Sequence, residues 1–230
     1  MARQNTYTRI IEAGLLLFNE EGERNISTNH IAAHLGISPG NLYYHFRNKD
    51  EIIVQLYRQY GERMVKCLQE AEAAHNIHDM ANYFNHIFDV MWDYRFLFSG
   101  VNTLLARSEE LVGEHNEFTQ AKLSPLMLKI MLQLMEAGIL KGSQQDMHDL
   151  CLNIWLVTRY WFDFDAAMRG QGKLLPDSKK LGVLRNFSLI RPYVAEAHLA
   201  EFNEVIARLQ TEKMKPVDLT EIKAEIKKVS

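Results

Sequence analysis

Residues 37–52, ISPGNLYYHFRNKDEI, bring together side chains whose chemistry suits contact with nucleic acid. The amide of Asn41 can hydrogen-bond a base edge, and Lys49 offers a point charge for a phosphate. Tyr44 and His45 offer apolar contact and hydrogen bonds to phosphate. A short helix that only had to fold would need an apolar stripe and little else. This mixture therefore indicates a surface that binds DNA.

The residues before this stretch predict a short helix with a defined start and end. Ser27 or Thr28 can cap its first turn, because either hydroxyl can accept a hydrogen bond from a backbone N–H there. Ile31 and Leu35 give the helix one apolar face. Gly36 then ends it, as glycine commonly does after the last helical turn.

A second short helix follows the turn. Ser38 can cap it, and Pro39 suits its first position, where a missing N–H costs nothing. Leu42 and Phe46 face the interior, and the helix ends near Phe46. Two short helices joined in this way are typical of a helix-turn-helix, whose second helix enters the DNA major groove with its N-terminal residues at the base edges.

Longer helices surround this motif. One spans residues 6–20, and another spans residues 49–74 and starts with a capping box of Asn48 and Glu51. Strand-like alternation is absent, so the chain is predicted to be all-α. Further helices are expected over residues 79–95, 99–110, 114–138, 146–169, 178–191 and 196–210. Pro192 should break or kink the helix that it follows.

The segments TRIIEAGLLLFNEEG and NISTNHIAAHLGISPGNLYYHFRNKDEII occur in this order within residues 6–53. Together they resemble the N-terminal domain of the TetR family of bacterial transcriptional repressors. The resemblance implies a three-helix DNA-binding domain in residues 1–48 and a C-terminal helical bundle in residues 49–230. It also implies that the bundle forms a homodimer, that the dimer binds a pseudo-palindromic double-stranded DNA operator, and that the bundle often holds a small-molecule effector.

The same resemblance implies which residues face the bases and phosphates. They are Thr28, Asn29, Ser38, Pro39, Gly40, Asn41, Tyr43, Tyr44, His45 and Lys49. Some members of the family carry a cation where Asn29 stands, so the base preference at that position stays open. Tyr43 also has two interpretations, since its ring can pack in the core while its hydroxyl reaches a phosphate.

Charge along the chain is sorted locally. The formal net charge is −3, so a DNA-binding surface must be a local patch on an acidic body. Residues 37–49 contain Arg47 and Lys49 and no acid, whereas residues 12–23 contain four glutamates. This distribution fits a reading surface at residues 37–49.

The chain shows neither a secretory signal at its start nor an apolar run near the roughly 20 residues that span a bilayer. Cys67 and Cys151 stand far apart within helical patterns, which makes a disulfide framework unexpected. These features favour a cytoplasmic location and no membrane partner.

The C-terminal part is rich in aromatic residues and methionines. They can form a core and dimer interface, or they can line a pocket for an apolar or aromatic effector, because cavities between bundle helices hold such ligands. The candidate pocket residues are Phe88, Met91, Trp92, Asn102, Met131, Trp155 and Arg159. Arg159 would suit an anionic head group, although an ion pair with Asp163 at i, i+4 is the simpler assignment.

Motifs of other function classes are not visible. There is no glycine-rich phosphate loop, nucleophile elbow or paired-carboxylate pattern, so neither catalysis nor a cofactor is expected. His30 and His34 have a spacing compatible with metal, but no third ligand accompanies them, and no metal site is expected. The sequence thus favours a ligand-responsive repressor; the alternatives are a DNA-binding structural or protein-interaction factor without an effector, and an enzyme on a helical bundle.

Overall fold

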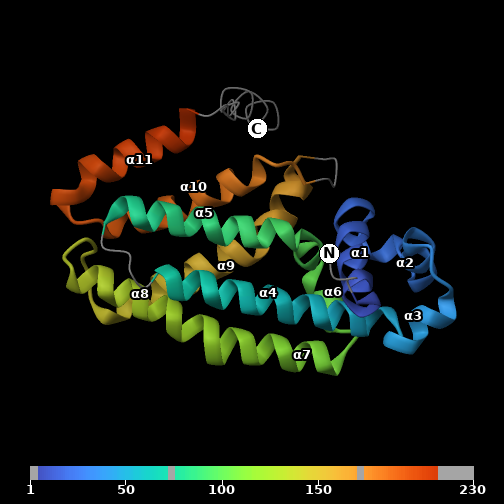
Figure 1. Ribbon diagram of the computed structural model, residues 1–230. Coiled ribbons are helices and arrows are strands. Elements are labelled where there is room, and N and C mark those ends of the chain that lie inside the picture. Colours follow the sequence, from blue (N-terminus) through green and yellow to red (C-terminus); the bar gives the residue numbers. More distant parts are fainter. Residues whose placement is uncertain (1–4, 72–75, 170–173, 212–230) are drawn as a thin grey trace, which may run out of the picture.

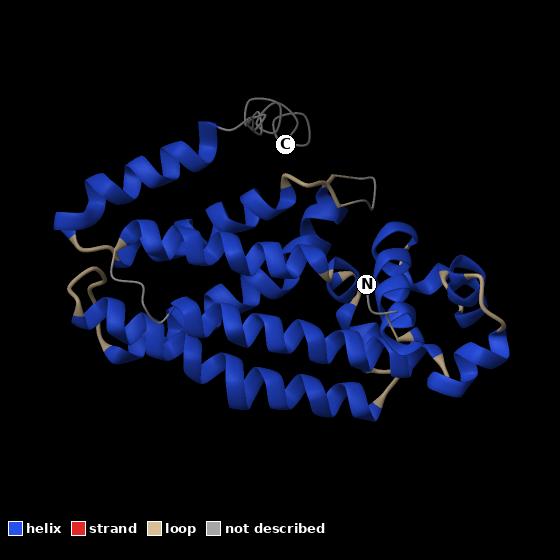
Figure 2. Cartoon of the chain, in the orientation of Figure 1, coloured by secondary structure: helices blue, strands red, loops and turns tan. Residues whose placement is uncertain are grey.

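The computed structural model describes residues 5–71, 76–169 and 174–211. Over these residues the chain is helical and contains no strand, and an isolated bridge joins Leu140 to Val194 (Figure 2). The predicted all-α class is confirmed. No helix among the described residues is long and apolar enough to cross a membrane.

The N-terminal helices form a small bundle at one end of the molecule, which we call the head (Figure 1). It consists of α1 (Thr6–Glu21), α2 (Thr28–Leu35) and α3 (Pro39–His45). Phe18 of α1 is fully buried, and the ring of Phe46, just after α3, stacks on Tyr7 with 4.8 Å between centroids. The arrangement of three helices predicted from the sequence is therefore present.

The long helix α4 (Lys49–Ala71) joins the head to the remaining helices, which we call the body. It packs against α1 near its start and against α5 (Ile77–Asp93) and α7 (Glu109–Asn116) in the body. The predicted end of this helix near residue 74 lies outside the described residues. No separate linker stands between head and body, because α4 belongs to both.

The body continues with a bundle around α4 and α5 (Figure 1). Its other elements are η2 (Arg95–Phe98), α6 (Val101–Leu105), the π-helix η3 (Glu117–Leu123), α8 (Ser124–Glu136), α9 (Gln144–Met168), α10 (Ser178–Ile190), η4 (Arg191–Tyr193), η5 (Glu196–His198) and α11 (Leu199–Thr211). The expected break near Pro192 is confirmed, since α10 ends at Ile190 and a 3-10 turn follows.

The predicted helices over residues 99–110 and 114–138 are wrong in their boundaries. The break lies earlier, at residues 106–108, and one continuous helical segment then runs through α7, η3 and α8. Ser108 starts it, because its hydroxyl accepts a hydrogen bond from Leu111 N at 3.2 Å. Pro125 lacks an N–H and its ring displaces the carbonyl four residues earlier, which accounts for the π-helical register of η3 just before it.

Candidate nucleic-acid interface

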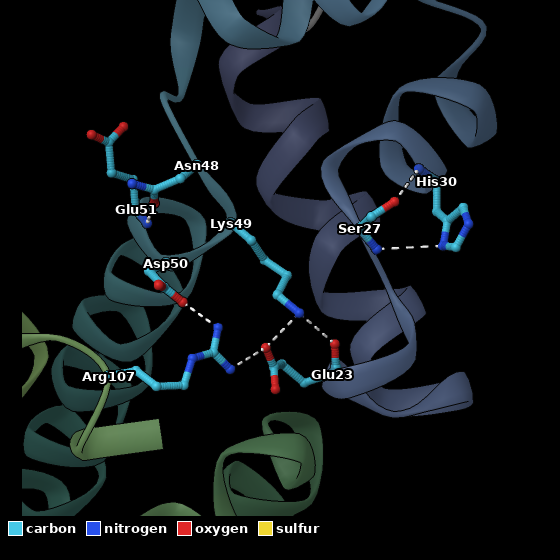
Figure 3. A network of polar contacts seen from close by, with 8 residues as sticks. All are labelled: Glu23, Ser27, His30, Asn48, Lys49, Asp50, Glu51 and Arg107. Carbon is cyan, nitrogen blue, oxygen red and sulfur yellow. Dashed lines mark hydrogen bonds and ion pairs between the residues drawn. The ribbon is translucent and has the colours of Figure 1, made fainter. Parts of the chain in front are cut away.

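Local caps fix the two helices of the motif. Ser27, rather than Thr28, caps α2, because its hydroxyl accepts from His30 N at 3.3 Å and the His30 ring accepts from Ser27 N at 3.4 Å (Figure 3). Gly36 ends α2 with a φ of +64°, a conformation that glycine adopts without strain. Ser38 caps α3 by accepting from Asn41 N at 3.2 Å. The turn between the helices is therefore set by residues within it.

The outer face of α3 is largely exposed where the sequence predicts DNA contacts. Tyr44 is 85 % exposed and Tyr43 is 48 % exposed, so Tyr43 belongs to the surface rather than to the core. The Tyr43 hydroxyl lies 3.2 Å from the Thr28 hydroxyl and links α3 to α2. Leu42, on the opposite face, is completely buried. The predicted contact residues that are exposed are Asn29, Ser38, Pro39, Gly40, Asn41, Tyr43 and Tyr44.

His45 is only half-buried and stands at the edge of this face. Its ring meets Tyr44 edge-on at 5.1 Å and Tyr7 at 6.4 Å between centroids. Since His45 is the last residue of α3, it connects the exposed rings to the packed interior of the head.

Gly40 occupies a helical position that has room for a side chain. A Cβ built there would meet only the Ser38 hydroxyl, at 3.9 Å. Glycine costs up to about 1 kcal/mol relative to alanine in a helix, and no described residue blocks a side chain here. Absence of a side chain lets another molecule approach the backbone at this point.

Lys49 pairs within the protein in this structure, and its predicted phosphate contact stays a prediction. Its ammonium lies 2.7 Å from Glu23 Oε1 and donates to the Glu23 carbonyl at 2.8 Å (Figure 3). Arg107 lies 2.8 Å from the same carboxylate and 2.5 Å from Asp50 Oδ1. We call Glu23, Lys49, Asp50 and Arg107 the head–body network.

The network places a nearly buried carboxylate between two cations. Burial alone would raise the pKa of Glu23, but hydrogen bonds from Lys49 and Arg107 lower it below its ordinary value. Glu23 belongs to η1 (Glu23–Asn25) in the head, whereas Arg107 lies between α6 and α7 in the body. The charge of Lys49 is thus used within the protein, to hold the head against the body.

A second polar contact also joins head to body. The Asn19 amide of α1 donates to the Asp93 carbonyl at 2.8 Å and accepts from Phe96 N at 3.1 Å. The ring of Phe18 packs beside Phe96 with 5.2 Å between centroids. Two contact points therefore restrain the orientation of α1.

The body encloses a cavity of about 40 Å³ between α4, α5, η3 and α9. Its walls are mainly aromatic rings and methionines, among them Tyr57, Tyr60, Met64, Phe118, Met127 and Trp155. A cleft of about 390 Å³ adjoins it and shares Thr119, Leu123, Met127 and Trp155 with its wall. The cavity and the cleft therefore lie next to each other and share part of their walls.

Comparison with known proteins supports a single family. The model of "Bacterial regulatory proteins, tetR family" matches residues 10–56, and that of the TetR "Bacterial transcriptional repressor" domain matches residues 59–202. A TetR-family transcriptional regulator from Marinobacter aquaeolei VT8 has a solved structure that is 34 % identical, with a TM-score of 0.79. The match covers 90 % of this chain and 99 % of that chain.

The chain belongs to the TetR family. An HTH-type transcriptional regulator of Staphylococcus aureus (strain USA300) is 52 % identical over 44 residues, which cover 19 % of this chain and 24 % of that protein. The match to this curated relative thus spans about a quarter of its length. SmeT, the repressor of a Stenotrophomonas maltophilia multidrug efflux pump, is 19 % identical with a TM-score of 0.58 over 84 % of this chain and 92 % of that chain, and shares the fold.

Three of the pocket residues predicted for this TetR-family chain line the cavity: Met91, Trp155 and Arg159. The other four lie elsewhere. Phe88 is buried against Phe162, at 5.9 Å between centroids, and Met131 is buried in the core. Trp92 packs under Arg95, whose guanidinium lies 4.9 Å from the ring, and Asn102 is exposed on α6.

The cavity also contains residues that sequence reasoning missed. Tyr57, Tyr60 and Met64 come from α4, for which the sequence predicts only the span and the capping box. Phe118 and Thr119 come from the π-helix η3, which was not predicted from the sequence. The cavity residues of α4, and likewise those of α5 up to Met91, recur at three- to four-residue spacing, so periodicity alone does not distinguish cavity from core.

Proposed function

We propose that this TetR-family chain is a dimeric repressor that binds a pseudo-palindromic operator and is released by a small apolar or aromatic ligand. Each α3 would enter one major groove, and the body cavity would hold the ligand. Lys49 would position the head through its ion pair with Glu23. The DNA contacts would come from Thr28, Asn29, Ser38, Pro39, Gly40, Asn41, Tyr43, Tyr44 and His45. Such a regulator acts in the cytoplasm, where bacterial DNA lies.

Gly40 is the observation that supports DNA binding most strongly. The fold has space for a side chain there, and helix propensity favours one, yet the residue is glycine. A DNA backbone or base edge that approaches α3 closely supplies the missing reason. Tyr44, exposed beside it, supplies the contact surface.

The dimer is supported by an exposed apolar stripe on α9. It consists of Leu152, Leu156, Tyr160, Phe164 and Met168, each four residues after the last. Successive residues at this spacing are neighbours on the helix surface, so the five form one slanting row along α9. A monomer would leave this row in water, whereas a second copy would cover it and place two heads on one DNA molecule.

The experiment begins with selection of binding sites from a random DNA duplex library by the full chain. Fluorescence anisotropy then measures the affinity of variants for the selected operator. Gly40→Ala and Tyr44→Ala should each raise the Kd at least about tenfold, with unchanged helicity, since each changes only the outer face of α3. Gly113→Ala on the exposed face of α7, where a Cβ meets nothing, is the matched control.

Retention of full operator affinity in both α3 variants would mean that α3 does not read DNA. The salt dependence of the same titrations gives a second test, because phosphate contacts make the affinity fall steeply with ionic strength. A salt-independent Kd would contradict the proposed phosphate contacts.

A further inference from the structure

Arg159 is the charged residue among those that line the cavity. The expected ion pair with Asp163 does not form between these two described residues, and Asp163 is exposed. The Arg159 guanidinium lies over the ring of Tyr160, 5.7 Å from its centroid. No carboxylate among the described residues forms an ion pair with this guanidinium, and a cation beside apolar walls is suited to an anion supplied from outside.

Polar groups of the cavity wall gather near this cation. The Tyr57 hydroxyl and His115 Nδ1 lie 2.7 Å apart in a buried hydrogen bond, and the Thr119 hydroxyl donates to the His115 carbonyl at 2.7 Å. Burial, and then the charge of Arg159, lower the pKa of His115 to about 4, so its imidazole is neutral at neutral pH. Arg159 therefore supplies the positive charge of this end of the site.

The remaining walls are suited to an apolar chain or ring. Phe84, Ile87 and Met91 of α5 face the cavity, and Met127 and Trp155 continue into the adjoining cleft. Methionines adapt to ligands of different shape, and mostly apolar walls with a few polar groups are typical of ligand sites. The π-helix η3 contributes Phe118 and Thr119, and π-helical segments occur frequently at functional sites.

We propose that the cavity, together with the adjoining cleft of about 390 Å³, binds a carboxylate-bearing amphiphile, with Arg159 pairing with the carboxylate and the methionines and rings surrounding the tail. This inference rests on the proposed function, because it names the chemical class of the effector. A single guanidinium matches one carboxylate through two parallel hydrogen bonds, whereas a dianion would leave one charge unpaired in an apolar site.

The experiment uses the full-length chain and three probes with the same eight-carbon tail: octanoate, 1-octanol and octylammonium. Isothermal titration calorimetry measures binding, and anisotropy with the selected operator measures release. Octanoate should bind at least about tenfold more tightly than 1-octanol, and octylammonium more weakly than both.

Three variants test the role of Arg159, with thermal melts to check folding. Arg159→Met should abolish the preference for octanoate over 1-octanol, and Arg159→Lys should keep part of it because the charge remains. Arg185→Met, on the exposed face of α10, is the matched control and should keep the whole preference. Absence of octanoate binding, or equal octanoate affinity in Arg159→Met and the parent chain, would overturn the inference.

The outcomes also separate this inference from the proposed function. Arg159-dependent binding of octanoate that leaves the operator complex intact would support the carboxylate site and contradict ligand release. Release by 1-octanol as efficient as release by octanoate would support a ligand-responsive repressor and overturn the carboxylate assignment.

Discussion

His115, in the body, is only 9 % exposed, and its imidazole forms a hydrogen bond with the Tyr57 hydroxyl. Burial, and then the positive charge of Arg159, lower its pKa from 6.5 to about 4. The unfolded chain therefore binds more protons than the folded chain between these two pKa values. The free energy of unfolding therefore has its full value above about pH 6.5, where His115 is neutral in both states. It decreases as the pH falls from about 6.5 toward about 4, because the unfolded chain takes up the proton first.

We expect the parent chain to lose up to about 2 kcal/mol more stability than the His115→Gln variant between about pH 7.5 and about pH 5. Glutamine keeps a polar group near Tyr57 but does not titrate, so the difference between the two slopes isolates this histidine. Urea unfolding at a series of pH values gives the measurement. Parallel pH profiles would show that His115 keeps an ordinary pKa in the folded chain.

Several roles of single residues could be predicted from the sequence, because their partners are close in the chain. The caps Ser38 and Asn48 are three residues from the backbone N–H groups that they accept from, at 3.2 and 2.9 Å. Lys49 could not be predicted in the same way, since its partner Glu23 is 26 residues away and the contact requires the folded head. The expected pairing of Arg159 with Asp163 used the same local rule and did not form.

At the scale of helices, α10 approaches α5 and α9 most closely at Gly182. A Cβ built there would overlap the Phe88 ring and lie 2.7 Å from Trp161 Cδ1. Both rings are buried, so neither can move aside without displacing further core residues.

Gly182→Ala should therefore destabilise the chain by about 1–3 kcal/mol, although alanine is the better helix former. Gly113→Ala, at a position on α7 where no atom lies near the new Cβ, should stabilise the chain by about 0.5–1 kcal/mol. Chemical denaturation of both variants beside the parent chain tests the pair. Equal stability of the two variants would show that α10 can move away from Phe88 at no cost.

The head–body network predicts a second difference between helices. Arg107 joins the α6–α7 connection to the head, whereas Arg58 joins α4 to α7 within the body, 2.7 Å from Glu114 and 3.0 Å from Glu110. Removing either arginine breaks two ion pairs, but only Arg107 contacts Glu23 of the head.

Arg107→Ala should raise the Kd for the operator about fivefold or more, because the head is then less restrained when α3 enters the groove. Arg58→Ala should leave the Kd within about twofold of the parent value, because exposed ion pairs of the body contribute little and do not orient α3. Anisotropy titrations at equal salt compare the two variants. Similar losses in both would mean that the network does not orient the head.

The elements themselves were mostly predictable, because apolar periodicity and capping residues act locally. The start of α3 and the end of α10 follow from Ser38 and Pro192. The π-helix η3 was not predicted, because a change of hydrogen-bond register leaves little trace in the apolar pattern. The cavity includes Phe118 and Thr119 of that π-helix, so this part of its wall stayed hidden from sequence reasoning.

For the whole molecule, α4 is the element that relates the cavity to the DNA-binding end. Gly61, in the middle of α4, faces the Phe118 ring, and a Cβ there would lie 3.3 Å from Phe118 Cδ2. Movement of that ring by a ligand would therefore press directly on α4. The boundary between residues 1–48 and 49–230 stays a prediction, because α4 packs against both parts.

The exposed stripe of α9 gives the prediction for the assembly. Phe164 is 56 % exposed near one end of the stripe, and a charge there would have to be buried in the proposed dimer. Phe164→Glu should therefore convert the dimer into a 26.7 kDa monomer that remains helical. Val112→Glu, at a 37 % exposed apolar position on α7, is the matched control and should leave the dimer intact.

Size-exclusion chromatography with light scattering measures the mass of each variant, and operator titrations follow on the same samples. A monomer has one head and occupies one half-site at a time. It therefore loses the gain in affinity that a dimer obtains by binding two half-sites, which lie about 34–36 Å or a multiple of that distance apart. The affinity of Phe164→Glu for a full operator should then fall to that for a single half-site. A Phe164→Glu variant that stays dimeric would place the interface on another face, whereas a monomer with full operator affinity would show that one head is sufficient.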